Sequence, residues 1–400
     1  MDKKNKTPNV PNLRFSNPYK LRKVRLGDIC TITGGYAFDS HKMKQQGEYQ
    51  IIKMGNLYNG IFDLSRNQSF INAPTKKELE YLIQKNDILI TLTGTTNKKD
   101  YGYIVQIEKP KKLLLNQRCA LIRASKVNEK YLFYLLNSND FLKQFYASST
   151  GGTGNQTNVS INDMLDFKVY ISNENDQLKI SNILNALDKK ISTQIKIIDD
   201  LILQKKYIIY SLLEAIQDNE KIMLKDLLFD YNVKTTINNE YPVLSSTASG
   251  MYLQTEYFNK EAASDNTTGY KIIPRGYCTY RSMSDTGLFT FNIQNLVEKG
   301  IVSPAYPVFS ANNYSNEFII LYLNNASYIK KQILELKSGG TRFALPFSTL
   351  GTLKIPKLEK EKQLSFIKTI TAFERKIKNE EKILNDLHKQ KNYLLNNMFI

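Results

Sequence analysis

The sequence predicts an α+β fold in which two pseudo-twofold-related α/β domains are joined by two long helices that pair as an antiparallel coiled coil. Three observations predict this fold. A helical segment occurs twice, about 186 residues apart; both copies carry an apolar seam with coiled-coil spacing; and a strand-rich segment precedes each copy. The chain has 400 residues, which is enough for two or three domains with a core each.

The repeated segment begins at Ala186 as ALDKKISTQIKIIDDLILQKKYIIYSLL and at Ala372 as AFERKIKNEEKILNDLHKQKNYLLNNMF. Identical residues at one constant offset are Ala186/Ala372, Lys190/Lys376, Ile191/Ile377, Asp200/Asp386, Leu201/Leu387, Gln204/Gln390 and Tyr207/Tyr393. Further upstream, Gln177-Leu178 corresponds to Gln363-Leu364, and STGGTGNQ from Ser149 corresponds to KSGGTRFA from Lys337. A repeat of this length predicts that each half of the chain ends in the same helix.

Apolar residues in both helices alternate spacings of four and three, which is the seam of a coiled coil. The seam consists of Leu187, Ile191, Ile198, Leu201 and Ile208 in the first helix and of Phe373, Ile377, Leu384, Leu387 and Leu394 in the second. Polar residues interrupt it at matching positions, Gln194 with Glu380 and Lys205 with Lys391, and such interruptions specify one register. We therefore expect an antiparallel intramolecular pair. The alternative is two amphipathic helices that each pack on their own domain.

Four further isoleucines of the first helix, Ile195, Ile197, Ile202 and Ile209, lie outside the seam. They present more apolar surface than one partner helix covers, which suggests that another subunit covers them. A helix of about 28 residues is roughly 42 Å long, and one turn of B-DNA is about 34 Å. Two domains held by such helices would suit two half-sites on one duplex.

The chain divides into five segments: a basic N-terminal tail (1–20), a first variable domain (21–172), a central helix (173–217), a second variable domain (218–357) and a C-terminal helix (358–400). Each variable domain contains short β-like runs between Gly and Asn turns, such as DILITLTG from Asp87 and GYCTYRS from Gly276. One helix is expected near the end of each domain, over EKYLFYLLNSNDFLKQF from Glu129 and EFIILYLNNASYIKKQILEL from Glu317.

The formal net charge of +17 indicates a polyanionic partner, and nucleic acid is the first candidate. The alternative is that lysines on exposed helix faces only maintain solubility, and charge alone does not separate nucleic acid from a membrane surface. The sequence has no signal-peptide pattern and no long uncharged apolar run, so we expect a soluble, cytoplasmic protein with no membrane partner. Three widely spaced cysteines and two histidines argue against a disulfide framework and a metal site.

The stretches between strands carry side chains that suit DNA, because Arg and Lys match guanine, Asn and Gln match adenine, and Ser, Thr and backbone amides match phosphate. In the first domain the candidates are Lys53, Thr93, Thr95, Thr96, Asn97, Lys98, Gln117, Arg118, Thr153, Asn155 and Gln156. In the second domain they are Ser245, Ser246, Arg281, Ser282, Thr341 and Arg342. For each residue the alternative is an ordinary solvated loop.

The Gly-Gly-Thr loops recur in both halves, and glycines let backbone amides approach an anion closely. Their alternative role is a tight turn before the shared helix. Arg342 directly follows the second loop, where amides and hydroxyls suit phosphate, whereas Arg281 follows a strand-like run and is expected to contact a base.

The sequence contains no Walker-type phosphate loop, no dinucleotide-binding glycine pattern after a strand, no paired cysteines for zinc and no Ser/His/Asp set. The Asn/Asp-Pro-Pro-aromatic tetrapeptide of amino-methyltransferases is absent as well. These absences predict a non-catalytic recognition protein.

The chain resembles the specificity (S) subunits of type I restriction–modification systems, the HsdS family. The resemblance covers nearly the whole chain. It includes VRLGDICTITGGYAF from Val24 and IMLKDLLFDYN from Ile222 at the domain starts, GIVSPAYPVF from Gly300, and helices of the form Q-x-x-I…L-D-x-x-I. The family pattern has Pro and Glu-Gln before each helix. This chain keeps Pro356 but has Ser172 in the first repeat, with Asp176 and Lys362 where Glu is usual.

The resemblance implies that each variable domain is a target recognition domain for one half of a bipartite sequence in double-stranded DNA. It also implies two methyltransferase (M) subunits and, in the full restriction complex, two restriction and motor (R) subunits. S-adenosylmethionine, ATP and Mg²⁺ are expected on those partners and none on this chain. The complex would be an adenine-N6 methyltransferase and ATP-dependent endonuclease in phage defence, with the target adenine flipped out.

Two other classes of protein share parts of this pattern. A stand-alone coiled-coil architectural or regulatory DNA-binding protein would also be basic and have two domains, but would bind DNA without a methyltransferase. A free-standing nuclease or methyltransferase would need the catalytic motifs that the sequence lacks.

Overall fold

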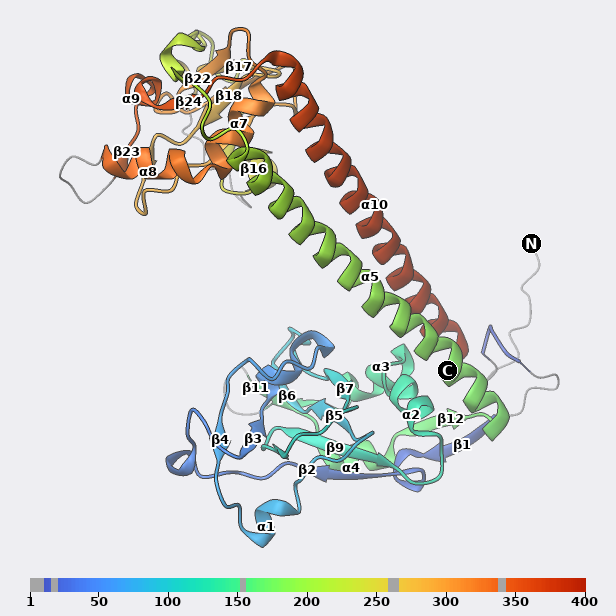
Figure 1. Cartoon of the computed structure of the whole chain (residues 1–400). Coiled ribbons are helices and arrows are strands. Elements are labelled where there is room, and N and C mark those ends of the chain that lie inside the picture. The colour runs from blue at the N-terminus through green and yellow to red at the C-terminus, as the bar shows by residue number, and fades with distance from the viewer. Residues whose placement is uncertain (1–10, 16–20, 152–155, 258–265, 337–342) are drawn as a thin grey trace, which may run out of the picture. The chain divides into compact units, whose positions relative to one another are not determined.

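The computed structural model describes residues 11–15, 21–151, 156–257, 266–336 and 343–400. The chain forms two compact units. The first contains residues 1–195 and 382–400, and the second contains residues 196–381. Both units combine strands and helices, as the predicted α+β fold requires (Figure 1).

The first unit contains most of its strands and short helices ahead of the long helix α5. Its strands are β1 (Arg22–Arg25), β2 (Cys30–Gly34), β3 (Tyr49–Ile52), β4 (Phe70–Ile71), β5 (Ile88–Thr91), β6 (Thr93–Thr95), β7 (Ile104–Gln106), β8 (Leu113–Leu115), β9 (Cys119–Ala124), β10 (Thr150–Gly151), β11 (Gln156–Asn158) and β12 (Lys168–Ile171). Its helices are α1 (Lys76–Leu79), α2 (Glu129–Leu136), α3 (Asn139–Ala147) and α4 (Ile161–Asp166), with 3-10 turns η1 (Leu26–Asp28), η2 (Ser40–Lys42) and η3 (Met54–Gly60).

The second unit contains the other half of the repeat. Its strands are β13 (Lys221–Met223), β14 (Leu228–Asp230), β15 (Leu244–Thr247), β16 (Gly250–Leu253), β17 (Lys271–Pro274), β18 (Cys278–Tyr280), β19 (Met283–Ser284), β20 (Phe291–Ile293), β21 (Lys299–Val302), β22 (Val308–Ala311), β23 (Phe343–Ala344) and β24 (Lys354–Pro356). Its short helices are α6 (Gln254–Tyr257), α7 (Asn316–Asn325), α8 (Ser327–Glu335) and α9 (Phe347–Thr352), with the 3-10 turn η4 (Leu224–Asp226).

Each unit has the same central antiparallel sheet of four strands. Its order is β2-β9-β5-β7 in the first unit and β14-β22-β18-β20 in the second. The apolar strand β5 is buried throughout because residues on both of its faces contact core side chains. A two-stranded ribbon closes each domain, β1 with β12 and β13 with β24. The sequence repeat therefore corresponds to a repeat of topology.

The single helix expected near the end of each domain is wrong, because both segments form two helices. In the first unit α2 ends at Leu136 and α3 begins at Asn139, where the Ser138 hydroxyl accepts a hydrogen bond from the backbone N–H of Phe141. The side chain of Asn137 donates to the carbonyl oxygen of Phe133, which ends the preceding helix. The second unit breaks at the equivalent place, between α7 and α8. Ser and Asn compete with helical hydrogen bonds in this way.

The two longest helices are α5 (Glu174–Glu214) and α10 (Lys360–Met398), of 41 and 39 residues. In the first unit the N-terminal part of α5 packs with the C-terminal part of α10, and Ile180, Leu184, Leu395 and Met398 share one core. In the second unit the C-terminal part of α5 packs with the N-terminal part of α10, and Ile209, Leu213 and Ile370 share the other core. The helices are therefore antiparallel in both units, and the predicted fold class is confirmed.

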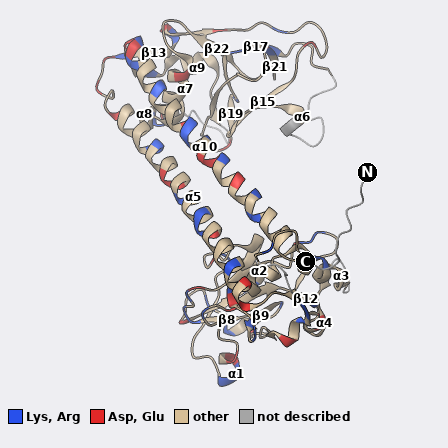
Figure 2. Ribbon diagram, turned by 90° about the vertical axis from the view of Figure 1, so that its right-hand side faces the viewer, with Lys and Arg blue, Asp and Glu red and all other residues tan. Residues whose placement is uncertain are grey.

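Seam positions are buried or half-buried along the paired parts of both helices. Between Phe373 and Leu394 of α10, the residues that are buried or half-buried fall at the alternating spacing of four and three. Lysines that interrupt the seam are paired with carboxylates, Lys205 with Glu374 at 3.3 Å in the second unit and Lys391 with Asp188 at 2.6 Å in the first. Both partners of one pair correspond to both partners of the other at the repeat offset. Lys, Arg, Asp and Glu residues occur along the length of both helices (Figure 2).

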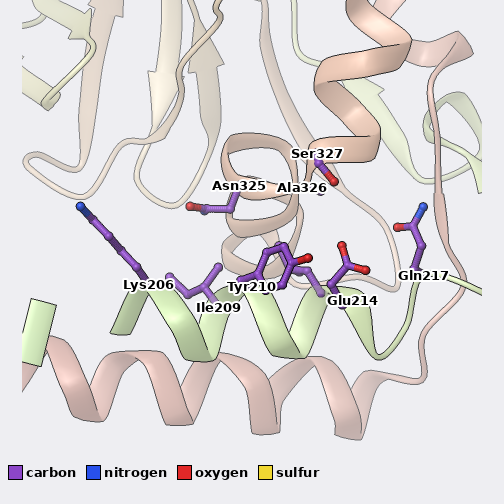
Figure 3. A pocket seen from close by; sticks show the side chains of 9 residues that line it. Lys206, Ile209, Tyr210, Glu214, Gln217, Asn325, Ala326 and Ser327 are labelled. Carbon is purple, nitrogen blue, oxygen red and sulfur yellow. The ribbon is translucent and has the colours of Figure 1, made fainter. Parts of the chain in front are cut away.

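One of the four isoleucines expected to face another subunit is covered by this chain itself. Ile209 is only 8% exposed, because it lies with Leu213 against the junction of α7 and α8 beside a small cavity of about 110 Å³ (Figure 3). Ile202 is half-buried, whereas Ile195 and Ile197 are exposed. Of the four, only Ile195 and Ile197 are exposed, and their coverage by another subunit stays a prediction.

Candidate nucleic-acid interface

Two candidate DNA-binding segments of the first domain form one small sheet, β10-β11-β6. Gln156 pairs with Thr95, and Asn158 pairs with Thr93. The Thr93 hydroxyl donates a hydrogen bond to the Asn158 side-chain oxygen at 3.0 Å. The strands β6 and β11, about 60 residues apart in the sequence, lie side by side (Figure 1).

The turn after β6 presents Thr96, Asn97 and Lys98 to solvent. Asn97 has φ of 67°, a left-handed conformation that asparagine tolerates. The Asp100 carboxylate closes this turn by accepting hydrogen bonds from the backbone N–H of Thr95 at 2.6 Å and from its hydroxyl at 2.8 Å. These hydrogen bonds lower the pKa of Asp100 from its usual value. The side chain of Thr95 thus shapes the turn, and its three neighbours protrude from it.

The turn between β8 and β9 lies beside the same sheet. The carbonyl oxygen of Arg118 accepts from the backbone N–H of Leu92, directly before β6, and Gln117 and Arg118 are both exposed. Asn116 donates its backbone N–H to the carbonyl oxygen of Ile52, which places Lys53 at this end of the domain. We call this set the first face: Lys53, Thr93, Thr95, Thr96, Asn97, Lys98, Gln117, Arg118 and Gln156.

A neighbouring group was missed by the sequence reasoning. Arg66, Tyr58, Gly55 and Asn67 line an open cavity of about 460 Å³ in the loop that begins at Lys53. The Arg66 guanidinium lies 5.2 Å from the centre of the Tyr58 ring, and the Arg66 side chain is 51% exposed. The signal was weak, because these residues lie in an irregular loop that no strand pattern marks.

That loop is held by one buried side chain. Asn56 is fully buried, accepts from the backbone N–H of Lys53 at 2.9 Å, and donates to the carbonyl oxygens of Asp63 at 2.9 Å and Arg66 at 2.6 Å. A buried amide with three hydrogen bonds fixes the chain around it. The Arg66–Tyr58 pair is therefore presented by an ordered loop.

In the second domain the described candidates gather around one groove of about 550 Å³. Its lining includes Ser245, Ser246 and Arg281, together with Thr247, Ala248, Met283, Ser284, Asp285, Thr286, Leu288, Phe289, Thr290 and Tyr306. We call this the second groove. Arg281 is exposed and directly follows β18, the counterpart of β5. Strand β19 pairs with β23 as β6 pairs with β11, so the two candidate regions follow equivalent strands.

Two of the candidate serines have partners within the domain. Ser246 is buried, and its hydroxyl accepts from the side-chain amide of Asn292 at 2.8 Å. The Ser282 hydroxyl donates to the carbonyl oxygen of Ala305 at 2.8 Å. Both hydroxyls fix the segments that carry Ser245 and Arg281. Four further candidates, Thr153, Asn155, Thr341 and Arg342, lie outside the described residues, as do the Gly-Gly-Thr loops for the most part.

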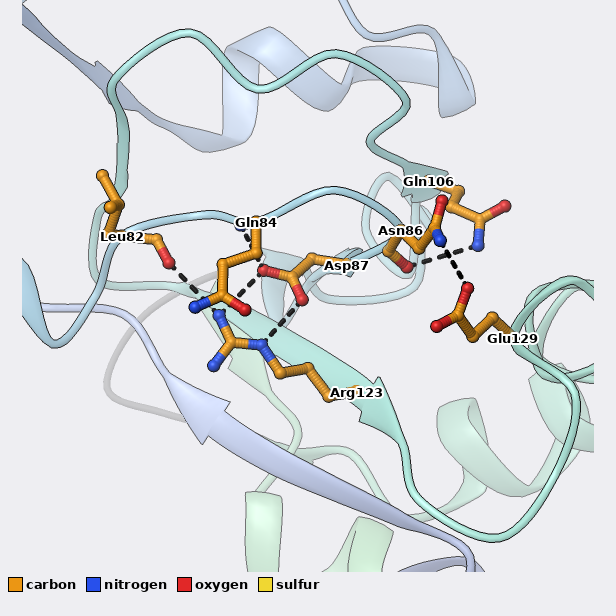
Figure 4. Close-up of polar contacts among 7 residues, drawn as sticks. All are labelled: Leu82, Gln84, Asn86, Asp87, Gln106, Arg123 and Glu129. Atoms are coloured by element: carbon orange, nitrogen blue, oxygen red, sulfur yellow. Dashed lines mark hydrogen bonds and ion pairs between the residues drawn. The ribbon is translucent and has the colours of Figure 1, made fainter.

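Arg123 has a structural partner. Its guanidinium donates two hydrogen bonds to the Asp87 carboxylate, at 2.7 and 2.9 Å, and a third to the carbonyl oxygen of Leu82 (Figure 4). These bonds raise the pKa of Arg123, and Asp87 is only 3% exposed. A guanidinium with all of these partners ties β9 to the start of β5 rather than contacting a ligand.

The described residues offer little nucleophilic or metal chemistry. Burial raises the pKa of the Cys30 and Cys119 thiols to about 12, and it raises the pKa of the Cys278 thiol further. Within the described ranges, no three His, Cys, Asp or Glu side chains gather closely enough to hold a metal ion. Of the helices placed by the structure, none combines the length and apolar composition needed to cross a membrane.

Each of the two repeated α/β domains collects polar side chains after equivalent strands and is joined to a long helix. The family model for the type I restriction modification DNA specificity domain matches residues 18–201, which include the first domain and much of α5. Residues 18–201 are therefore similar to type I restriction–modification DNA specificity domains.

Solved structures of such proteins have the same fold. The type I restriction–modification system S subunit from M. genitalium is 16% identical, with 98% of this chain and 99% of that chain covered and a TM-score of 0.54. A chain from a study of complex assembly and conformational transition of the type I R-M system is 14% identical, with 94% and 96% covered and a TM-score of 0.57. Both similarities extend over the two domains and both long helices.

Proposed function

We propose that this chain is the DNA-recognition subunit of a type I restriction–modification complex, in which each domain recognises one half of a bipartite target. The observation that carries this proposal is the duplicated placement of polar, exposed residues. The first face follows β5 and the second groove follows β18, two strands with the same place in the same sheet. Two such surfaces in one basic chain suit two half-sites on one duplex.

The paired helices set the distance between the half-sites in this proposal. The matched ion pairs Lys205–Glu374 and Lys391–Asp188 support it, because an alignment shifted by one turn would separate both pairs. A single register gives a single spacing, as polar seam residues do in other coiled coils. Four residues inserted near Ile198 are then expected to change the gap and leave both half-sites as they were.

The helices also provide a docking surface for two methyltransferase subunits. Three exposed apolar pairs recur at the repeat offset, Leu178/Leu364, Ile197/Ile383 and Tyr207/Tyr393, with exposed fractions between 38% and 70%. Exposed apolar side chains that occur at equivalent positions of both helices suit one kind of partner bound twice. Ile195 lies beside this surface but has Glu381 at the matching position, so it belongs to one copy only.

Catalysis belongs to the partner subunits in this proposal. The methyltransferase subunits would carry S-adenosylmethionine and methylate adenine at N6, and two restriction and motor subunits would use ATP and Mg²⁺. The buried, protonated thiols of this chain and the absence of catalytic motifs from its sequence support a non-catalytic role. The alternative, a stand-alone architectural DNA-binding protein, would have no methyltransferase partner to cover the matched apolar pairs.

Methylome sequencing tests the proposal most directly. A host that carries this chain with its methyltransferase partner is expected to acquire N6-methyladenine in one bipartite motif with a gap of fixed length. A host with the partner alone should lack that motif. DNA binding by the purified chain alone with full affinity, and no new methylated motif in the host, would instead support the architectural protein.

A further inference from the structure

Each domain is joined to its long helix by a buried glutamine at the same place in the repeat. Gln177 lies in the first turn of α5 and is 3% exposed, and Gln363 lies in the first turn of α10 and is fully buried. The proposed function assigns them no role, because neither faces solvent. Their hydrogen bonds connect each domain to the start of its long helix, and in the first unit Tyr134–Asp188 and Ser181–Asn128 add further hydrogen bonds between the same parts.

In the first unit, the side-chain amide of Gln177 donates to the carbonyl oxygen of Ser172 at 2.8 Å. Its side-chain oxygen accepts from the backbone N–H of Asn128 at 3.0 Å. Ser172 lies in the connection between β12 and α5, and Asn128 is the residue that caps the N-terminus of α2. One side chain therefore links the start of the long helix to the recognition domain.

The second unit repeats these bonds atom for atom. Gln363 donates to the carbonyl oxygen of Leu358 at 2.7 Å and accepts from the backbone N–H of Ser315 at 2.9 Å. Leu358 lies between β24 and α10, and Ser315 caps the N-terminus of α7, the counterpart of α2. Two independent occurrences of the same geometry distinguish this contact from a chance polar contact.

A tyrosine completes each arrangement. The hydroxyl of Tyr131 accepts from the backbone N–H of Ser172 at 3.4 Å, and the hydroxyl of Tyr314 accepts from that of Leu358 at 2.8 Å. The connecting residue is thus held at both its N–H and its carbonyl oxygen. Because these groups are withdrawn from water, a domain that rotated on its helix would leave buried donors and acceptors without partners.

We propose that Gln177 and Gln363 are positioning residues that fix the orientation of each recognition domain on its own helix, and thereby make the complex selective for one gap length between half-sites. This inference rests on the proposed function. Base contacts lie at the first face and the second groove, so the glutamines affect the gap and not the sequence of either half-site. Apolar contacts alone are non-directional and allow a range of orientations.

The test uses the chain in complex with its methyltransferase partner and duplexes that carry the wild-type motif with the gap at its normal length or one base pair longer or shorter. Gln177→Met and Gln363→Met keep the length of the side chain and remove its hydrogen bonds. We expect the preference for the normal gap to fall about tenfold, since about one hydrogen bond's free energy no longer opposes rotation. Each half-site sequence should stay unchanged.

Matched controls exist in both units. Gln144 and Gln332 make similar paired hydrogen bonds, but to the backbone of Lys168 and Lys354 within the domain. Gln144→Met and Gln332→Met are expected to keep the wild-type gap preference.

The outcomes separate the two proposals. A complex that is less stable to urea but as selective for the gap as wild type would show that the glutamines only stabilise the fold, and would overturn the inference. Equal loss of gap preference in the Gln144 and Gln332 controls would overturn it as well. If wild type itself has no bipartite motif, the proposed function fails before the variants are compared.

Discussion

The first recognition domain presents its candidate DNA contacts on a small sheet and a closed turn, whereas the second presents them around a groove. The supports of these two regions are nearly identical. Both have the same sheet order, the same break between two helices, and the same glutamine contacts to the long helix. The two domains differ in the side chains beyond the ends of equivalent strands and in their smaller sheets, which are β4-β3-β8 in the first and β15-β16 and β17-β21 in the second.

This contrast separates residues that are the same in both halves from residues that differ between the halves. Residues that hold a domain on its helix form hydrogen bonds to backbone groups of the framework that both halves share. The same geometry therefore occurs in both halves. Residues of the first face and the second groove have side chains that differ between the halves, as two different half-site sequences would require. Three predictions test this separation between repeated support and differing surface.

The largest effect is expected at the repeated apolar pairs. Changing Tyr207 or Tyr393 to Asp places a charge against an apolar partner surface and should weaken methyltransferase binding by about 2–4 kcal/mol. Each single variant is expected to lose one of two bound subunits, and the double variant should lose both. Mass measurement of the co-expressed complex gives the stoichiometry.

Gln204→Asp and Gln390→Asp provide the controls, since these exposed residues are also matched at the repeat offset and are already polar. They should keep both subunits. Full binding by the Tyr207/Tyr393 double variant would show that the docking surface does not include these two tyrosines.

An intermediate effect is expected in the second groove. Arg281→Ala should cost about 1–3 kcal/mol on the cognate site and relax one position of the second half-site only. Arg275→Ala is the matched control, because Arg275 is also an exposed arginine of this domain but pairs with Glu298 at 2.8 Å and does not line the groove. Binding selections with randomised half-sites measure the result. Weakening that is uniform over all sequences would make Arg281 a phosphate contact.

The repeat made much of the fold predictable from sequence. Helical periodicity is strong over 28 residues, and agreement at one offset ties the two helices to equivalent places in two domains. The break at Asn137-Ser138 was missed, because apolar spacing continues across it and only the local hydrogen bonds of these residues end the helix. The coverage of Ile209 depends on the junction of α7 and α8, more than 100 residues away in the sequence.

The surfaces were less predictable for a related reason. Polar loop residues such as Ser246 and Ser282 look alike in sequence whether their hydroxyls are exposed or engaged within the domain. The distinction depends on Asn292 and Ala305, which lie in other segments. Whether Thr96, Asn97, Lys98 or Arg281 contacts DNA stays a prediction. Gln177 and Gln363 were visible in the sequence only as repeated residues, and their hydrogen bonds come from tertiary structure.

The smallest effect is expected at the loop around Arg66, and it tests whether the first face extends to that residue. Arg66 lies in an irregular loop beside Tyr58, without a strand to direct it toward base edges, so a phosphate is its natural ligand. Arg66→Ala should weaken binding to all sequences alike and reduce the slope of log affinity against log salt by about one.

Arg25→Ala is the control. The two arginine side chains are 51% and 55% exposed, and each pairs with an aspartate at 3.4 Å. Arg25 also pairs with Asp166 at 3.3 Å and lies on β1, outside the first face. Equal slopes for both variants and wild type would restrict the first face to the residues around β6 and β11. Relaxation of a single base position in the first half-site would instead make Arg66 a base contact, and the first domain would then recognise DNA through this loop as well.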